Sequence, residues 1–186
     1  IFSSQSATDT IPMVEVPNTQ QFLPSLQKLP DHLIRLLENN TIVISTKFTW
    51  ENCQAHTLSD GFFLCQPPSG FVHETGHLID FYGINMQRGK DFALGKTDEE
   101  IRALANEYER MFSIPKDLDT KPSIFPGLPA GFLTEYSTNN IIENFADHFA
   151  RYVELPEFFR ERAVKDPGIA EKYEFLKTKI FLGKEY

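Results

Sequence analysis

The pattern of hydrophobic residues changes along the chain, from one typical of strands to one typical of helices. Residues 41–50 (TIVISTKFTW) and 61–66 (GFFLCQ) are rich in β-branched and aromatic side chains, which is typical of strands. A short amphipathic pattern precedes them at residues 31–37, with Asp31 as a fair helix cap. From residue 71 onward, apolar residues recur every three or four positions, which is typical of helices. The sequence therefore predicts a few early strands and several later helices.

Four later helices are predicted. The first covers residues 71–82, the second opens with a capping box of Thr97 and Glu100, and the third covers residues 139–153. The last begins at Asp166, just before a proline. Three of them have a clear apolar face. It comprises Ile101, Leu104, Ala105, Tyr108, Met111 and Phe112 in the second helix; Ile142, Phe145, Ala146, Phe149 and Val153 in the third; and Ile169, Tyr173, Leu176 and Ile180 in the last.

These elements predict an α+β fold with a small mixed sheet and a mainly helical C-terminal half. A length of 186 residues suits a single domain over residues 1–186, in which the polar residues 1–10 form a flexible arm. Residues 114–135 carry four prolines and two glycines, so we expect a long irregular loop there.

Composition and charge narrow the class of partner. The chain is 41% hydrophobic and 24% charged, as in a globular protein, and its net charge is −8. An acidic chain disfavours nucleic acid and anionic membrane surfaces as partners, because both attract basic surfaces. No apolar run approaches the roughly 20 residues of a membrane span. We expect a monomer whose main partner is neither nucleic acid nor a membrane.

Two cysteines and the first residue bear on localisation. The chain starts at Ile1 with no visible signal peptide, so we expect a processed, secreted product. In that setting Cys53 and Cys65 would form a disulfide. Two reduced cysteines in a cytosolic protein are the alternative. Asn39 begins a glycosylation sequon, which matters only for a secreted eukaryotic protein.

The stretch VHETGHLID, at residues 72–80, carries the strongest chemical signal. On a helix, His73 and His77 project from one face and can bind one ion. A catalytic zinc keeps a fourth position for water, whose proton the neighbouring Glu74 can accept. The alternative is a solvated helix with two idle histidines. The apolar flanks disfavour it, because they indicate a buried helix.

The residues after the histidines exclude one class of zinc site. The metzincin extension requires glycine at position 80 and histidine at position 83, where this chain has Asp80 and Gly83. Asp80 is expected to orient a histidine or to cap a neighbouring backbone group. The alternative is a solvated aspartate at the end of the helix.

A third zinc ligand is expected on the later helix, in the stretch IIENFADHFARY. It offers Glu143, Asp147 and His148, of which the first two lie four positions apart on one face. We assign Glu143 to the zinc and Asp147 to orienting a zinc-bound histidine. An ion pair of Asp147 with Arg151 on the helix surface is the alternative.

HETGHLID and ENFADHFARY resemble motifs of the catalytic domain shared by anthrax lethal factor and the secreted Pro-Pro endopeptidases. That family has His-Glu-x-x-His-x-x-Asp, then Glu-Phe-Phe-Ala-Glu-x-Phe, whose first glutamate is its third zinc ligand. Glu143 matches that ligand and Asp147 the later acidic residue, whereas Asn144 and Asp147 depart from the usual phenylalanine and glutamate. A family tyrosine seven residues before the ligand, proposed to stabilise the oxyanion, matches Tyr136.

The resemblance covers roughly residues 60–182. It implies a zincin-like fold and a secreted zinc-dependent endopeptidase with one zinc per chain. Glu74 would be its general base and Tyr136 its oxyanion donor; the alternative for Tyr136 is a core tyrosine. We further expect the peptide or protein substrate to lie along an edge strand and the loop at residues 113–135 to roof the cleft. The candidate strand residues are Phe62, Phe63 and Leu64.

Other functions stay open. An aminopeptidase on the same scaffold would need an acidic group for the free amine, and none is identified. A non-catalytic module with structural zinc would not need Glu74, and a decayed site would not keep the full set of residues. The sequence predicts no cleavage specificity, including any preference for proline.

Overall fold

The computed structural model describes residues 23–37, 41–45, 57–58, 61–65, 70–84, 97–116 and 125–186. Its α-helices are α1 (Leu23–Lys28), α2 (Asp31–Leu37), α3 (Phe71–Leu78), α4 (Asp98–Phe112), α5 (Ile141–Glu154), α6 (Pro156–Lys165) and α7 (Pro167–Phe175). Two π-helical turns, η4 (Ile79–Ile84) and η8 (Leu176–Ile180), continue α3 and α7, and a 3-10 turn, η7 (Tyr136–Thr138), precedes α5.

Three short strands pair in the order β1-β3-β2: β1 (Thr41–Ser45), β2 (Thr57–Leu58) and β3 (Gly61–Cys65). β1 runs parallel to β3 and β2 runs antiparallel to it. The prediction that Phe62, Phe63 and Leu64 form an edge strand is therefore wrong, because β3 lies in the middle. β2 covers only Gly61 and Phe62, so within the described strands the rest of β3 pairs with β1 alone.

The predicted α+β class with a small mixed sheet also needs correction. The residues whose side chains are described are 73% helix and include no strand, so their fold is mainly helical. For the three strands only the backbone pairing is described. The physical reason for the helical core is that α4, α5 and α7 bury aromatic side chains against one another.

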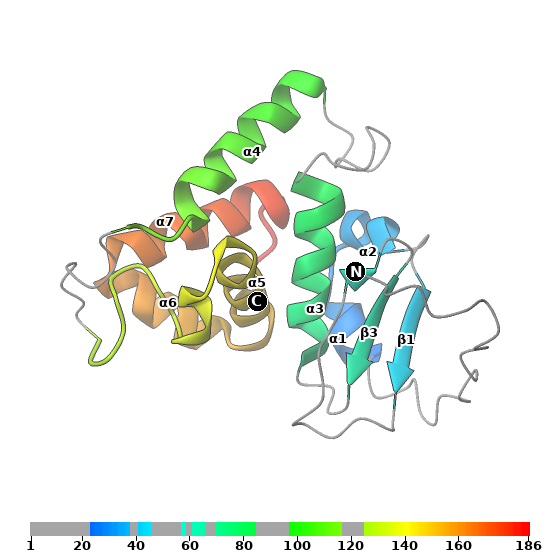
Figure 1. Cartoon of the computed structure of the whole chain (residues 1–186), viewed down its shortest axis with the longest axis horizontal. Helices are drawn as coiled ribbons and strands as arrows, with labels where there is room; N and C mark the ends of the chain where they lie inside the picture. The colour runs from blue at the N-terminus through cyan, green and yellow to red at the C-terminus, as the bar shows by residue number, and fades with distance from the viewer. Residues whose placement is uncertain are drawn as a thin grey trace.

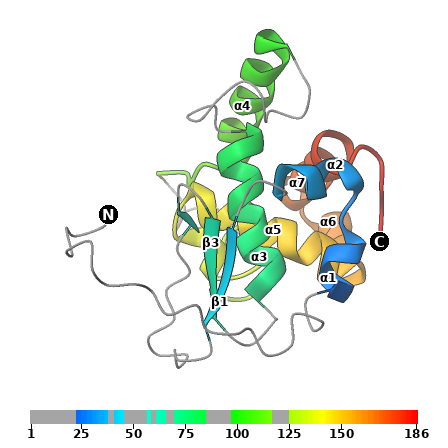
Figure 2. The same ribbon diagram turned by 90° about the vertical axis from the view of Figure 1, so that its right-hand side faces the viewer.

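Helix α3 occupies the centre of the molecule. In Figure 1 the strands, α1 and α2 lie on one side of α3, and α5, α6 and α7 lie on the other. Figure 2 shows α3 crossing in front of α5. The crossing is close because Gly76 has no side chain: a β-carbon there would lie 2.9 Å from Cα of Ala146. This close approach brings the later helix to the face of α3 that carries the histidines.

An aromatic core holds the helical half together. Phe112 of α4 contacts Phe145 of α5 and Phe175 of α7, with ring centroids 5.2 and 5.6 Å apart. Tyr152 of α5 stacks on Phe181 at 4.6 Å. Such pairs contribute roughly 0.5–1.5 kcal/mol each beyond the burial of their surface. The predicted apolar face of α5 is confirmed as this core, except that Ile142 is 45% exposed.

Most of the predicted helix boundaries are confirmed. The Thr97 hydroxyl accepts from the Glu100 backbone N–H and the Glu100 carboxylate accepts from the Thr97 backbone N–H, so α4 begins at a capping box. Asp166 caps α7 as expected. The pattern missed α6, which begins at Pro156, and the π-helical turn that follows α3. Among the described helices none is both long and apolar enough to cross a membrane.

Candidate metal centre

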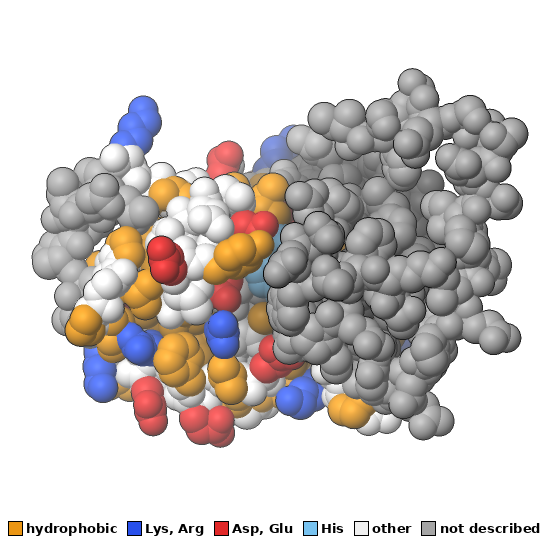
Figure 3. Space-filling model, turned by 60° about the horizontal axis from the view of Figure 1, so that its bottom comes forward, with side chains coloured by type: hydrophobic (Ala, Val, Ile, Leu, Met, Phe, Trp, Pro, Cys, Tyr) orange, Lys and Arg blue, Asp and Glu red, His pale blue; other side chains and the backbone are white. Residues whose placement is uncertain are grey.

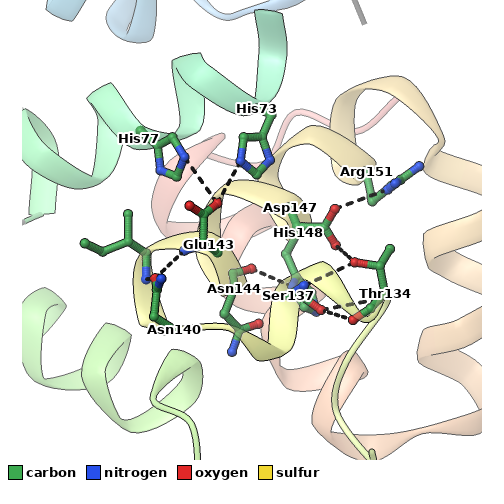
Figure 4. A network of polar contacts seen from close by, with 11 residues as sticks. His73, His77, Thr134, Ser137, Asn140, Glu143, Asn144, Asp147, His148 and Arg151 are labelled. Carbon is green, nitrogen blue, oxygen red and sulfur yellow. Dashed lines mark hydrogen bonds and ion pairs between the residues drawn. The ribbon is translucent and has the colours of Figure 1, made fainter. Parts of the chain in front are cut away.

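His73 and His77 project from one face of α3 toward Glu143 of α5 (Figure 4). Nε2 of His73 lies 3.0 Å, and Nε2 of His77 lies 3.4 Å, from Oε2 of Glu143. One ligand atom from each of the three residues lies within 4.8 Å of the others. The structure therefore joins the three residues that the sequence assigned to a metal, and this group can hold a metal ion.

The donor set and its spacing fit zinc. Bonds of about 2.0–2.1 Å at tetrahedral angles place two zinc ligand atoms about 3.3 Å apart, close to the separations found here. Two imidazoles and one carboxylate form a known ligand set for a catalytic zinc, with the fourth position left for water or substrate. The side chains of His73, His77 and Glu143 keep 15%, 11% and 21% of their surface exposed, so they are within reach of solvent.

Glu143 is held at the start of α5. The Asn140 side-chain oxygen accepts hydrogen bonds from the backbone N–H groups of Ile142 and Glu143, both at 2.9 Å. This cap fixes the first turn of the helix and with it the carboxylate. Burial raises the pKa of Glu143, but hydrogen bonds from His73 and His77 outweigh it and hold that pKa well below its usual value. The carboxyl is therefore ionised, as a metal ligand must be.

Glu74 lies beside the ligand group but is not part of it. Its side chain is buried, with 8% exposure, and Oε2 has no hydrogen-bond partner among the described residues. Burial raises the pKa of Glu74 to about 7, against the lowering effect of His73, while Glu143 raises it further. A buried carboxyl with a raised pKa is suited to exchanging a proton near neutral pH.

Tyr136 lies beside the same site. Its side chain is 52% exposed, so the alternative of a core tyrosine is wrong. Its ring centroid is 5.5 Å from that of His73. Burial of the hydroxyl and the carboxylate of Glu143 raise the pKa of Tyr136 to about 12, so the phenol keeps its proton at neutral pH. A protonated hydroxyl at this position can donate a hydrogen bond to a bound molecule.

Asp147 has other partners than the predicted histidine. Its Oδ2 accepts a hydrogen bond from the Thr134 hydroxyl at 2.9 Å, and its Oδ1 lies 3.5 Å from Nε of Arg151. The pair with Arg151, our alternative, is present, although the carboxylate is buried rather than on the surface. Nδ1 of His77 has no hydrogen-bond partner within the described part of the chain, so no described carboxylate orients that nitrogen.

Asp80 is buried, with 3% exposure, so it is not a solvated residue at the end of a helix. It lies in η4, beside Tyr108 of α4. Burial raises the pKa of the Tyr108 hydroxyl, and the Asp80 carboxylate raises it further. Asp80 therefore helps to join α4 to the end of the metal-binding helix.

Some predictions fall outside what the structure describes. Cys53 and Asn39 are not among the described residues, and for Cys65 only the backbone is described, so the disulfide and the sequon stay predictions. The predicted long loop is irregular at residues 113–116 and 125–135. Residues 117–124 lie outside the described ranges, and the proposed roof over the cleft stays a prediction.

Three contributors to the site were missed by sequence reasoning. Gly76 permits the close crossing of α3 and α5, and Asn140 caps the helix of Glu143. Thr134 binds Asp147. Only Asn140 had a local signal, because asparagine is a preferred cap three residues before a glutamate.

The site reaches the molecular surface. The partial exposure of all three candidate ligands shows this. Figure 3 shows one face of the molecule, on which a histidine side chain lies beside acidic and hydrophobic side chains.

Comparison of the chain with protein-family models, with curated proteins and with solved structures gives no significant match. The geometry of these residues and the resemblance of the two motifs are therefore the two grounds for a function.

Proposed function

We propose that this chain is a zinc-dependent endopeptidase. The observation that carries the proposal is the convergence of His73, His77 and Glu143 around one point, with the buried Glu74 on the same helix. A structural zinc site has four protein ligands and needs no carboxyl group beside it. Three ligands, a free position and a neighbouring base are what hydrolysis requires.

The reaction is hydrolysis of a peptide bond. Zinc, when bound, supplies a Lewis acid that polarises the scissile carbonyl and lowers the pKa of water. Glu74 accepts the proton of the attacking water and delivers it to the leaving amine. Tyr136 donates a hydrogen bond from its hydroxyl to the oxygen that becomes negatively charged, since that hydroxyl stays protonated at neutral pH.

The partially exposed ligands and the half-exposed Tyr136 support a site open to a polypeptide rather than a closed chamber. This favours an endopeptidase over an aminopeptidase. From the sequence, we propose that the enzyme is secreted and monomeric.

The test combines metal content with peptide digestion. After dialysis against metal-free buffer, the purified chain is expected to retain about one zinc per molecule, measured by mass spectrometry. A library of peptides with blocked N-termini should be cleaved by the wild type. Glu74→Gln should keep its zinc but lose at least about 100-fold in rate.

Glu99→Gln is the matched control, because Glu99 is an exposed glutamate at the start of α4. It should behave as the wild type. A chain that takes up no zinc contradicts the proposal. Cleavage restricted to free N-termini would favour the aminopeptidase, and equal rates for Glu74→Gln and wild type would exclude Glu74 as the base.

A further inference from the structure

Burial holds Tyr136 only in part. Half of its side chain is exposed, and it stands on a three-residue turn, η7. A hydrogen-bond donor in catalysis must be held within a fraction of an ångström of its productive position. Something other than burial of the tyrosine must therefore fix this turn.

The turn is closed by hydrogen bonds between Thr134 and Ser137. The Ser137 hydroxyl donates to the Thr134 carbonyl at 2.7 Å, and the Ser137 backbone N–H donates to the Thr134 hydroxyl oxygen at 3.2 Å. Ser137 is fully buried. These contacts make residues 134–137 a compact unit, on which Tyr136 and its neighbour Glu135 face outward.

A side-chain hydrogen bond joins this unit to α5. The Thr134 hydroxyl, which accepts from Ser137, donates its own proton to Oδ2 of Asp147 at 2.9 Å (Figure 4). Asp147 lies on the same helix as Glu143, one turn further on, and is itself held by Arg151. The chain of contacts therefore runs from the helix that carries the metal ligand to the turn that carries the tyrosine.

We propose that Thr134 and Asp147 are positioning residues, which hold the Tyr136 hydroxyl in register with Glu143. This inference rests on the proposed peptidase function and deepens it. It also replaces the expected role of Asp147 in orienting a zinc-bound histidine. A histidine-orienting carboxylate would act on metal affinity, whereas this contact acts on the position of the tyrosine.

The test uses two substitutions of one residue. Thr134→Val keeps the shape of the side chain and removes the hydroxyl; Thr134→Ser keeps the hydroxyl. In the zinc-loaded protein, Thr134→Val should lower kcat by about 10–100-fold, the size expected when a catalytic group is displaced by about 1 Å. KM and zinc affinity should stay close to the wild type. Thr134→Ser should restore most of kcat.

A double variant separates positioning from a general structural effect. In the background of Tyr136→Phe, which lacks the hydroxyl, Thr134→Val should cause no further loss of kcat. A loss of equal size in both backgrounds would overturn the inference, as would a wild-type kcat for Thr134→Val. A fall in zinc affinity parallel to the fall in kcat would also overturn it, because Thr134 and Asp147 would then act on the metal ligands.

A measurement that needs no activity keeps this inference distinct from the proposed function. The rings of His73 and Tyr136 are close enough, at 5.5 Å between centroids, for a nuclear Overhauser effect between their protons. It should be present in wild type and Thr134→Ser and lost in Thr134→Val. Its persistence in Thr134→Val overturns the inference. Its loss in a chain that hydrolyses no peptide would support the positioning contact while the peptidase proposal fails.

Discussion

Gly76 of α3 faces Ala146 of α5 so closely that a β-carbon on Gly76 would lie 2.9 Å from the Cα of Ala146. The glycine lies between the two histidines in sequence, and the alanine follows Glu143 by three positions. The close contact between the helices therefore also sets the spacing of the candidate metal ligands. A change at either residue alters the distance from the imidazoles to the carboxylate.

We predict that Gly76→Ala weakens metal binding at least tenfold. The new methyl group meets backbone, which cannot give way as a flexible side chain would, so α3 and α5 must separate. Overpacking of this kind costs about 1–3 kcal/mol in unfolding free energy. Gly70→Ala is the control, because a β-carbon there would meet no atom within 4 Å. Zinc titration measures the affinity and thermal unfolding measures the stability of each variant. Equal zinc affinities in Gly76→Ala and Gly70→Ala would contradict the prediction.

Loss of the helix cap should reach the metal through Glu143. Asn140→Ala removes the acceptor for two backbone N–H groups, which typically costs about 0.5–2 kcal/mol. The first turn of α5 then frays and the affinity for zinc falls. Asn139→Ala is the comparison, since Asn139 is its exposed neighbour before the helix. Chemical denaturation and competition with a chelator give the two quantities, and unchanged zinc affinity in Asn140→Ala would rule out this coupling.

Tyr136→Phe should separate binding from catalysis. The ring remains beside His73, so zinc content and thermal stability should match the wild type. Loss of one hydrogen-bond donor to a developing oxyanion lowers kcat by about 100–1,000-fold. Steady-state kinetics on a blocked peptide measure it. A change confined to KM would mean that the hydroxyl binds substrate and takes no part in the chemical step.

The local part of this site was predictable, and the rest was not. His73, Glu74 and His77 lie within five residues, so their relation follows from helix geometry alone. Glu143 and Asp147 share one face of their helix, and the match to the third zinc ligand of the resembling family favoured Glu143. The partners of Asp147 could not be predicted, because Thr134 reaches it from an irregular loop whose path has no sequence period.

The sheet was misjudged for a related reason. The β-branched run at residues 41–50 and the aromatic run at residues 61–66 do contain β1 and β3. Strand periodicity cannot tell which strand lies in the middle, and the two-residue β2 is too short to leave a pattern. Nor does it tell how far the later helices bury one another's aromatic side chains.

A buried lysine makes stability depend on pH. Lys172 is 4% exposed, and its Nζ donates to the Gly131 carbonyl at 2.6 Å and to the Asn144 side-chain oxygen at 3.0 Å. Burial lowers its pKa from 10.5 to about 7, although Asp166 and Asp147 oppose this. Between these values the unfolded chain binds a proton that the folded chain lacks, so rising pH favours folding.

The unfolding free energy of wild type relative to Lys172→Met should therefore rise between about pH 7 and 10. The slope is roughly 1.4 kcal/mol per pH unit, and it vanishes below pH 7, where both states are protonated. Lys165→Met is the control, at an exposed lysine at the end of α6. The difference in unfolding free energy between wild type and this variant should stay constant across the same pH range. Denaturation curves across this range decide the matter, and parallel pH profiles for all three proteins would show that Lys172 does not titrate in this window.

His73 and Glu143 stand 70 positions apart in the chain. An ion that joins them closes a ring of that size, and the entropy of closing a ring grows only with the logarithm of its length. Ten further residues would add only about 0.1 kcal/mol. Residues inserted after the exposed Lys116 would lie within this ring. They should therefore change the affinity of the site for an ion very little. The length of the segment between the two ligands therefore places little entropic limit on ion binding.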